Sequence, residues 1–311
     1  MTLAQAQAVI ASPFFSAFLE PAADRCACIT AWLSGCGIPH RTVTLQDKTH
    51  IVITYRQSAY DSRFKMKTCI AHYDRDDNSP GANDNSAACV QLLLFAQRLL
   101  HAKTAHNIRI IFTDGEEAGA GGIRNQGAYR LGQGLRSLAM HHDDIFVFDL
   151  CGLGDTLILS ESGIYGRDAK KTQALAALHR RCQHYAEAAC CGQWFSLPTA
   201  YSDNAGFISA GIPAQVFTVL PRAEAVLLRR YLPPLTAGTP NPLTAAQALQ
   251  HYVISNSPLP DGSPLAAVIP QTWQRMHSPQ DSLETLTPQA FILIDRLLNH
   301  LAAVKEPVKN K

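Results

Sequence analysis

Short apolar runs alternate along the chain with longer segments whose apolar residues recur at helical spacing, a pattern typical of strands and helices following one another in turn. The strand-like runs are Arg41–Leu45, His50–Tyr55, Lys67–Tyr73, Asn107–Thr113, Ile145–Leu150, Thr156–Ser160 and Ala214–Leu220. The helical segments are Ala22–Cys36, Asp84–His101, a stretch ending near Arg136, Thr172–Cys191 and Thr287–Val304. This alternation predicts an α/β fold, a three-layer sandwich with a mixed, largely parallel central sheet and helices on both faces.

One long segment departs from this pattern. Pro221–Gln271 is rich in proline and carries only short helical pieces, so we interpret it as a lid or an excursion over the surface. A length of 311 residues lies at the upper end of what one domain holds. We therefore expect one domain over residues 1–311, with residues 221–271 as an excursion within it.

The composition narrows the class of partner. Apolar residues make up 47% of the chain and charged residues 17%, with a formal net charge of +2 and no long run of one sign. This balance argues against binding to nucleic acid or to an anionic membrane. No apolar stretch is long enough to span a bilayer, so we expect no membrane segment.

The N-terminal segment and the cysteines give an expectation for the cellular compartment of the protein. The segment MTLAQAQAVIASPFFSAFLEPAADR has an apolar middle but no basic start, so we interpret it as a first helix rather than a signal peptide. The nine cysteines are an odd number, and several, such as Cys69, Cys89 and Cys151, lie inside apolar segments. We expect a reduced, cytoplasmic protein, and the sequence leaves its oligomeric state open.

Five side chains that can bind a metal ion occur in short motifs, most of them at the ends of predicted strands. They are His72 in AHYD, Asp84 in GANDN, Glu117 in DGEE, Asp149 in FDLCG and His277 in MHSPQDS. Carboxylates mixed with neutral imidazoles suit zinc or a similar divalent ion. Two neighbouring ions need one carboxylate that bridges them, plus one carboxylate and one histidine each, and this set has that composition.

Several of these residues also have an ordinary structural explanation. Asp84 could cap the helix that follows it, and His277 could lie on the surface. The pair Glu116 and Glu117 could be a solvated acidic turn. Asp149 is the clearest indication of a metal, because a lone carboxylate in the apolar run IFVFDL is costly to bury without a cation.

Two further carboxylates are candidates for catalytic roles. Asp74 is two residues beyond His72, and residues i and i+2 of a strand share a face, so Asp74 can accept the second ring N–H of His72. Glu116 precedes Glu117 in a turn where adjacent carboxylates point in different directions. One of them can bind a metal while Glu116 serves as the general base.

The ordered motifs resemble the co-catalytic di-zinc aminopeptidase family of the bacterial leucyl aminopeptidase type, whose relatives include plasma glutamate carboxypeptidase and the glutaminyl cyclases. The resemblance runs from about Ala22 to the C-terminus and implies a zinc-exopeptidase-like domain. The roles that it implies are His72 with Asp149 on one zinc ion, Glu117 with His277 on the other, Asp84 as the bridge, Glu116 as general base and Asp74 as the residue that orients His72.

The segment SDNAGF at Ser202–Phe207, followed by GIPA, resembles a family motif beside the active site. The family often carries histidine after Ser-Asp, whereas this chain has Asn204. We therefore treat Asp203 and Asn204 as candidate substrate-binding residues.

The resemblance implies a hydrolase that uses two zinc ions per chain to remove N-terminal residues from peptides with a free N-terminus. Three alternatives stay open: a glutaminyl cyclase-like acyltransferase with a single zinc, a di-zinc carboxypeptidase or dipeptidase, and a binding module without activity. The segment AGAGG after Glu117 resembles the turn of the aminopeptidases more than the longer insertion of the cyclases. The presence of all five ligands and the base argues against a binding module.

Overall fold

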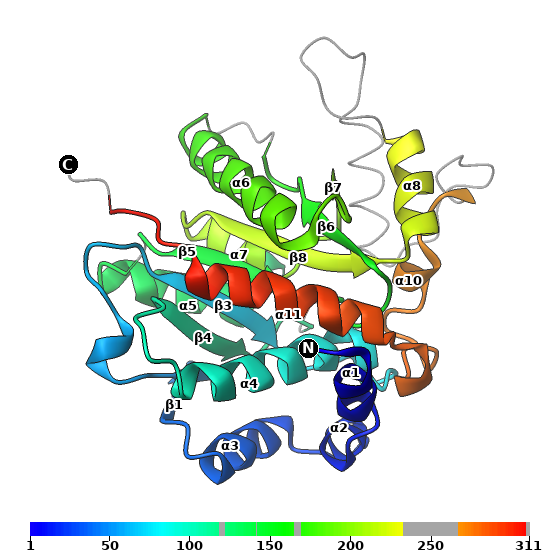
Figure 1. Cartoon of the computed structure of the whole chain (residues 1–311), viewed down its shortest axis with the longest axis horizontal. Helices are drawn as coiled ribbons and strands as arrows, with labels where there is room; N and C mark the ends of the chain where they lie inside the picture. Colours follow the sequence, from blue (N-terminus) through cyan, green and yellow to red (C-terminus); the bar gives the residue numbers. More distant parts are fainter. Residues whose placement is uncertain (118–121, 141, 165–168, 233–266, 309–311) are drawn as a thin grey trace.

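The computed structural model of the chain describes residues 1–117, 122–140, 142–164, 169–232 and 267–308. Within these ranges eight strands form one sheet (Figure 1). The strands are β1 (His40–Leu45), β2 (Lys48–Ile53), β3 (Lys67–His72), β4 (Ile108–Thr113), β5 (Asp144–Phe148), β6 (Thr156–Ser160), β7 (Trp194–Leu197) and β8 (Ala214–Leu220). Their order across the sheet is β1-β2-β4-β3-β5-β8-β6-β7.

The sheet is mixed, as predicted. The pairs β3–β4, β3–β5, β5–β8 and β6–β7 are parallel. The pairs β1–β2, β2–β4 and β6–β8 are antiparallel. The four central strands β4, β3, β5 and β8 therefore run in one direction, and their carboxyl ends share one edge of the sheet.

Helices cover both faces of this sheet. Their bounds are α1 (Leu3–Ile10), α2 (Pro13–Leu19), α3 (Arg25–Gly35), α4 (Ala87–Leu100), α5 (Gly127–Ser137), α6 (Ala169–Cys190), α7 (Asp203–Ser209), α8 (Arg222–Tyr231), α10 (Gln271–Gln274) and α11 (Pro288–Ala303). Helices α4, α6 and α11 lie on one face, and α5 packs with α7 on the other (Figure 1). The predicted three-layer α/β sandwich is confirmed.

The central strands are buried on both faces, which explains their continuous apolar sequences. In β3, Cys69 and Ala71 belong to the core beneath α4 and α11, whereas Ile70 belongs to the core beneath α5. All three side chains are fully buried. Burying an isoleucine side chain contributes about 1.5–3 kcal/mol, so these strands form a rigid platform for the residues that follow them.

The parallel register brings the ends of three strands together. His72 of β3 is level with Thr113, the last residue of β4. The turn that carries Glu116 and Glu117 begins two residues after Thr113, at Gly115. Ile70 is level with Val147 of β5. Two residues further along these strands come His72 and Asp149, so the sheet itself sets them side by side.

Three features differ from the elements that the sequence predicts. The N-terminal segment forms two helices rather than one, because Ser12 caps a new helix whose first residue is Pro13. Strand β7 and helix α7 were not predicted as elements, and both are short. Helix α8 occupies the start of the proline-rich segment, whose residues 233–266 lie outside the described part of the chain.

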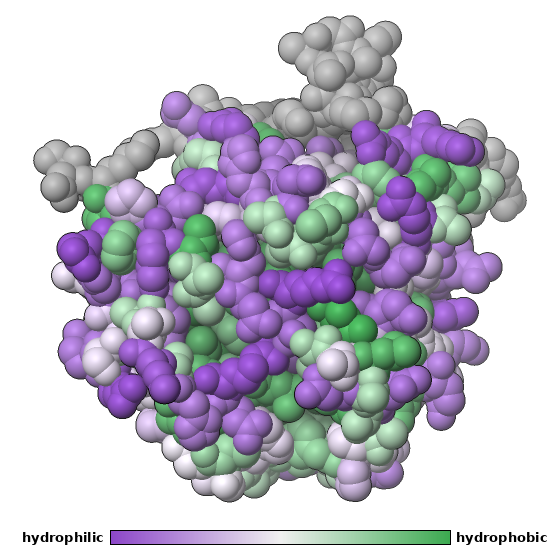
Figure 2. All heavy atoms as spheres, viewed as in Figure 1, coloured by the Kyte–Doolittle hydropathy of each residue, from purple (hydrophilic) through white to green (hydrophobic). Residues whose placement is uncertain are grey.

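Polar side chains cover most of the face seen in Figure 2, with apolar side chains in scattered patches among them. None of the helices in the described ranges combines the length and the apolar content that crossing a membrane requires. All nine cysteines are free thiols.

Candidate metal centre

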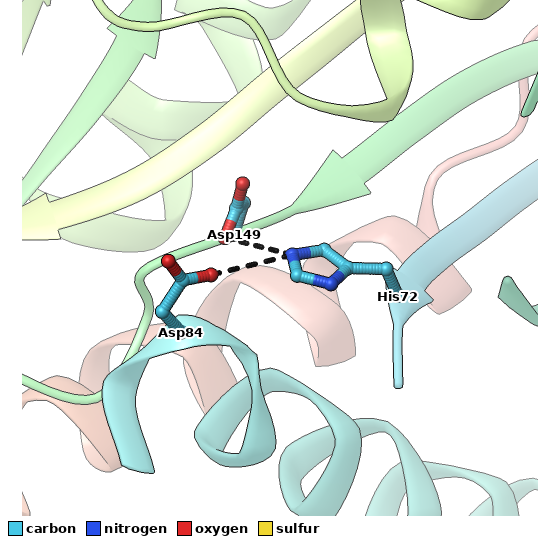
Figure 3. A group of neighbouring side chains, drawn as sticks. All are labelled: His72, Asp84 and Asp149. Atoms are coloured by element: carbon cyan, nitrogen blue, oxygen red, sulfur yellow. Dashed lines mark ion pairs between the residues drawn. The ribbon is translucent and has the colours of Figure 1, made fainter. Parts of the chain in front are cut away.

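The first group of donor atoms surrounds His72, the last residue of β3. Its side chain is fully buried, and its Nε2 lies 3.4 Å from Oδ1 of Asp84 and 3.6 Å from Oδ1 of Asp149. Figure 3 shows both carboxylates pointing toward the imidazole from different elements, Asp149 from just beyond β5 and Asp84 from the segment ahead of α4. Three segments far apart in the sequence thus supply one cluster of donors.

The second group surrounds His277, in the loop after α10. Its Nε2 lies 3.4 Å from Oδ2 of Asp84 and 3.0 Å from Oε2 of Glu117. Asp84 therefore takes part in both groups, with Oδ1 toward one histidine and Oδ2 toward the other. All five predicted ligands lie together, and the side chain of His277 is only 30% exposed rather than being an open surface histidine.

The donor atoms are close enough to share metal ions. In each of the groups His72–Asp84–Asp149 and Asp84–Glu117–His277, one atom from every residue lies within 4.8 Å of the others. Buried atoms without any hydrogen bond include Nε2 of His72, Oε1 of Glu117 and Oδ1 of Asp149. Buried polar atoms are nearly always satisfied, so atoms left without partners at one spot fit a site that holds cations.

Asp74 lies behind His72, on the side away from the other carboxylates. Its Oδ1 is 3.6 Å from Nδ1 of His72, and its backbone oxygen is 3.3 Å from the same nitrogen. Its Oδ2 accepts a hydrogen bond of 2.9 Å from the backbone N–H of Glu117. One carboxylate thus contacts the imidazole of one donor group and fixes the backbone of a residue from the other.

Glu116 lies in the turn after β4, next to the two donor groups. One of its carboxylate oxygens lies within 4.8 Å of donor atoms of His72 and Glu117, and Oε1 accepts a hydrogen bond of 3.2 Å from Gln126. Burial raises the pKa of Glu116 well above its ordinary value, and the charges of Glu117 and Asp149 raise it further. A raised pKa makes this carboxylate a better acceptor for a proton.

The carboxylates of the two donor groups raise the pKa values of both histidines. Burial alone would lower the pKa of His72, but the nearby carboxylates of Asp149, Asp74 and Asp84 outweigh burial and raise it well above its ordinary value. Hydrogen bonds to Asp84 and Glu117 raise the pKa of His277 to about 11. His277 is therefore protonated at neutral pH, the raised pKa of His72 favours its protonated form, and a metal ion would have to displace these protons.

A pH-dependent metal affinity follows from these raised values. Zinc affinity should rise between about pH 6 and about pH 8, by roughly tenfold per pH unit for each proton released, because a metal binds the neutral imidazole. Zinc titrations at several pH values, repeated in buffers of different ionisation enthalpy, measure both the affinity and the number of protons. An affinity that is constant over this range would contradict the assignment of the histidines as donors.

The segment that carries Asp84 is not helical, contrary to the predicted helix Asp84–His101. Helix α4 begins at Ala87, and Asp84 has backbone angles of −110° and 86°, outside the helical region. The segment turns sharply at Gly81, whose φ is 65° and where a Cβ would lie 2.6 Å from the backbone oxygen of Asp84. Asp84 therefore does not cap α4, and its side chain is free to face both histidines.

Asp203 and Asn204, at the start of α7, are both buried. Oδ2 of Asp203 accepts a hydrogen bond of 2.5 Å from the hydroxyl of Thr113, and burial raises its pKa to about 7. Thr113 is level with His72 in the sheet, so Asp203 lies beside the strand ends that carry the metal centre. Oδ1 of Asn204 instead accepts the backbone N–H of Ser202 at 2.9 Å, which fixes the turn before α7.

Two residues that the sequence analysis did not single out also reach this region. Asp281 belongs to the same motif as His277, and its carboxylate binds the backbone of the Asp84 segment. Arg25 on α3 is 5% exposed and donates hydrogen bonds to the backbone oxygens of Tyr73 and Pro80 and to the hydroxyl of Ser86. Neither contact has a local signal in the sequence, because each joins segments far apart along the chain.

Solved structures with the same architecture include three that differ in length. LapA aminopeptidase of Legionella pneumophila has a TM-score of 0.61 and 14% identity, over 97% of this chain and 71% of that one. A glutaminyl cyclase of Porphyromonas gingivalis has a TM-score of 0.58 and 15% identity, over 96% and 97%. BSAP, a zinc aminopeptidase from Bacillus subtilis, has a TM-score of 0.50 and 17% identity, over 84% of this chain and 51% of that one, so this chain spans about half its length.

These likenesses define the class of fold, one found both in aminopeptidases and in a glutaminyl cyclase. A search of curated proteins found no match. The model of Peptidase family M28 matches residues 51–302. The chain belongs to peptidase family M28.

Proposed function

We propose that this M28 peptidase is a zinc aminopeptidase, which removes residues from the N-terminus of peptides with two zinc ions per chain. The observation that carries the proposal is the position of Asp84, whose two oxygens each lie 3.4 Å from a different histidine. A carboxylate in this position suits a bridge between two neighbouring ions. The two donor groups on either side of it have matching composition, one histidine and one further carboxylate each.

In this proposal each ion has its own pair of ligands besides the bridge. His72 and Asp149 would hold one ion, and Glu117 and His277 the other. Asp74 would fix the ring orientation of His72 through Nδ1, as carboxylates behind ligating histidines commonly do. Zinc suits this mixture of imidazole and carboxylate donors, and another divalent ion would be accepted by the same groups.

The chain supplies the proton transfers of the hydrolysis. Bound zinc would lower the pKa of water and polarise the scissile carbonyl. Glu116 would accept a proton from the attacking water at its carboxylate and later deliver it to the leaving amine. Its raised pKa makes it a better acceptor for the proton of the water.

The substrate would be a peptide with a free α-amine. Carboxylates crowd the centre, and a protonated or metal-facing amine is the end of a peptide that such a surface attracts. Asp203 is the candidate for contact with the substrate, supported by its hydrogen bond to Thr113, which is level with His72, and Asn204 shapes the same turn. A di-zinc carboxypeptidase or dipeptidase would use the same donors, so the choice of terminus is part of the proposal.

A glutaminyl cyclase is the second candidate, favoured by the likeness that covers nearly all of both chains. Such an enzyme would use a single zinc, whereas two complete donor groups are present here. Residues 118–121, which belong to the turn that the sequence analysis compared with the cyclases, lie outside the described part of the chain. The number of bound ions therefore separates the candidates.

Zinc content of the purified chain is the test. After dialysis against modest zinc we expect about two ions per chain, as co-catalytic sites require. Release of N-terminal residues from a panel of peptides, with the same peptides blocked by an N-acetyl group as the control, should accompany it. About one ion, together with loss of ammonia from peptides that begin with glutamine, would favour the cyclase instead.

A further inference from the structure

Asp281 binds three consecutive residues of the segment that carries Asp84. Its Oδ1 accepts the backbone N–H of Asn83 at 2.7 Å, and its Oδ2 accepts that of Asp84 at 2.9 Å. Its own backbone oxygen accepts the N–H of Ala82 at 3.2 Å. The side chain is 2% exposed, so these hydrogen bonds form in a region from which water is largely excluded.

The same segment is tied to the loop after β5. Oδ1 of Asn83 accepts the backbone N–H of Gly152 at 2.7 Å, and the oxygen of Gly152 accepts the N–H of Thr287 at 2.9 Å. A Cβ at Gly152 would lie 3.0 Å from this oxygen of Asn83 and closer still to two other side chains, so the contact needs a glycine there. Three loops that carry donors, after β3, after β5 and after α10, thus meet at one buried network.

The carboxylate of Asp281 contacts backbone rather than the donor groups. Both carboxylate oxygens accept a backbone N–H, and the donor groups within the described ranges do not include this residue. Asp84 and Asn85 have backbone angles outside the helical region, and the N–H groups of Asn83 and Asp84 find their partners in Asp281. Removing the acceptor would leave two buried N–H groups unsatisfied, which a chain avoids by shifting the backbone.

We infer that Asp281 is a positioning residue: it holds the backbone of Asp84 in the orientation from which the two carboxylate oxygens of Asp84 face both histidines. The inference rests on the proposed two-ion site. Residues that orient metal ligands commonly contribute 10–100-fold to metal affinity. Because Asp84 belongs to both donor groups, loss of its orientation should weaken both ions together.

The experiment compares Asp281→Asn with Asp144→Asn in the full chain. Asp144 is equally buried and binds Lys65 and Arg181, but it is the first residue of β5, at the opposite end from Asp149. Zinc affinity is measured by competition with a chromophoric chelator, and the melting temperature of each protein is measured without metal. We expect Asp281→Asn to lower zinc affinity about 10–100-fold, and Asp144→Asn to lower only the melting temperature.

Unchanged zinc affinity in Asp281→Asn, or an equal loss in both variants, would overturn the inference while leaving the proposed function intact. Absence of zinc from the unaltered chain would overturn both. If Asp281→Asn does not fold, Asp281→Glu takes its place, because the longer side chain displaces both acceptor oxygens from the N–H groups of Asn83 and Asp84. A folded Asp281→Glu protein with full zinc affinity would likewise overturn the inference.

Discussion

Replacing Glu116 with glutamine should leave the metal content unchanged and lower turnover by about 10²–10⁴-fold, the usual contribution of a general base. Glutamine has nearly the same shape, and its amide oxygen can still accept the hydrogen bond from Gln126. It cannot take up a proton from water. The measurement is kcat on a peptide substrate, together with zinc content and the melting temperature of the variant.

The control for this variant is Glu161→Gln. Glu161 directly follows β6, which runs antiparallel to β8, so this carboxylate lies at the opposite edge of the sheet. Burial raises its pKa as it does that of Glu116. Turnover of Glu116→Gln equal to that of Glu161→Gln would mean that Glu116 is not the base.

The second large effect concerns Asp84, since both donor groups share it. Asp84→Ala should lose both zinc ions, whereas Asp149→Asn should lose or weaken only one, because Asp84 lies next to both histidines and Asp149 belongs to the donor group of His72. The loss of affinity in Asp84→Ala should exceed the 10–100-fold that follows from removing a residue behind a ligand. The amount of zinc per chain after dialysis shows whether each variant holds two ions, one ion or none.

If Asp84→Ala kept one ion at full affinity, the carboxylate would belong to one site only and the bridge would be excluded. If Asp149→Asn removed both ions, the two sites would not be separable in the way that their geometry indicates. Either result would also weaken the comparison with co-catalytic enzymes, because that chemistry depends on two neighbouring ions.

The donor set could be predicted because each member follows a strand or lies in a motif of recognisable order. Asp149 was expected within an apolar strand, whereas β5 ends at Phe148 and the side chain of Asp149 is 14% exposed. An aspartate in an apolar run therefore singled out Asp149 as a candidate, although its side chain is less deeply buried than the sequence suggested. His277 has no local signal, and only the order of the other motifs singled it out.

The structural features that the sequence did not predict depend on contacts between segments that are distant along the chain. The helix predicted from Asp84 starts three residues later, because Asp281 takes the N–H of Asp84 into a different hydrogen bond. Strand β7 has only four residues, three of them partly exposed, so its pattern is too weak to detect. The order of strands across the sheet also has no local code, although the parallel core agrees with the continuous apolar runs of β3, β4, β5 and β8.

The contacts of Arg25 indicate that residues ahead of the family match help to shape the candidate metal centre. The family match starts at residue 51, yet this buried guanidinium on α3 holds the backbone oxygens of Tyr73 and Pro80, on either side of the loop between His72 and Asp84. It rests against the ring of Phe18 at 4.8 Å, so the first helices carry it. A fragment trimmed to the family boundary would keep every proposed ligand and lose the cation beneath them. Sequence variation in the first helices can therefore reach the metal centre without touching a ligand.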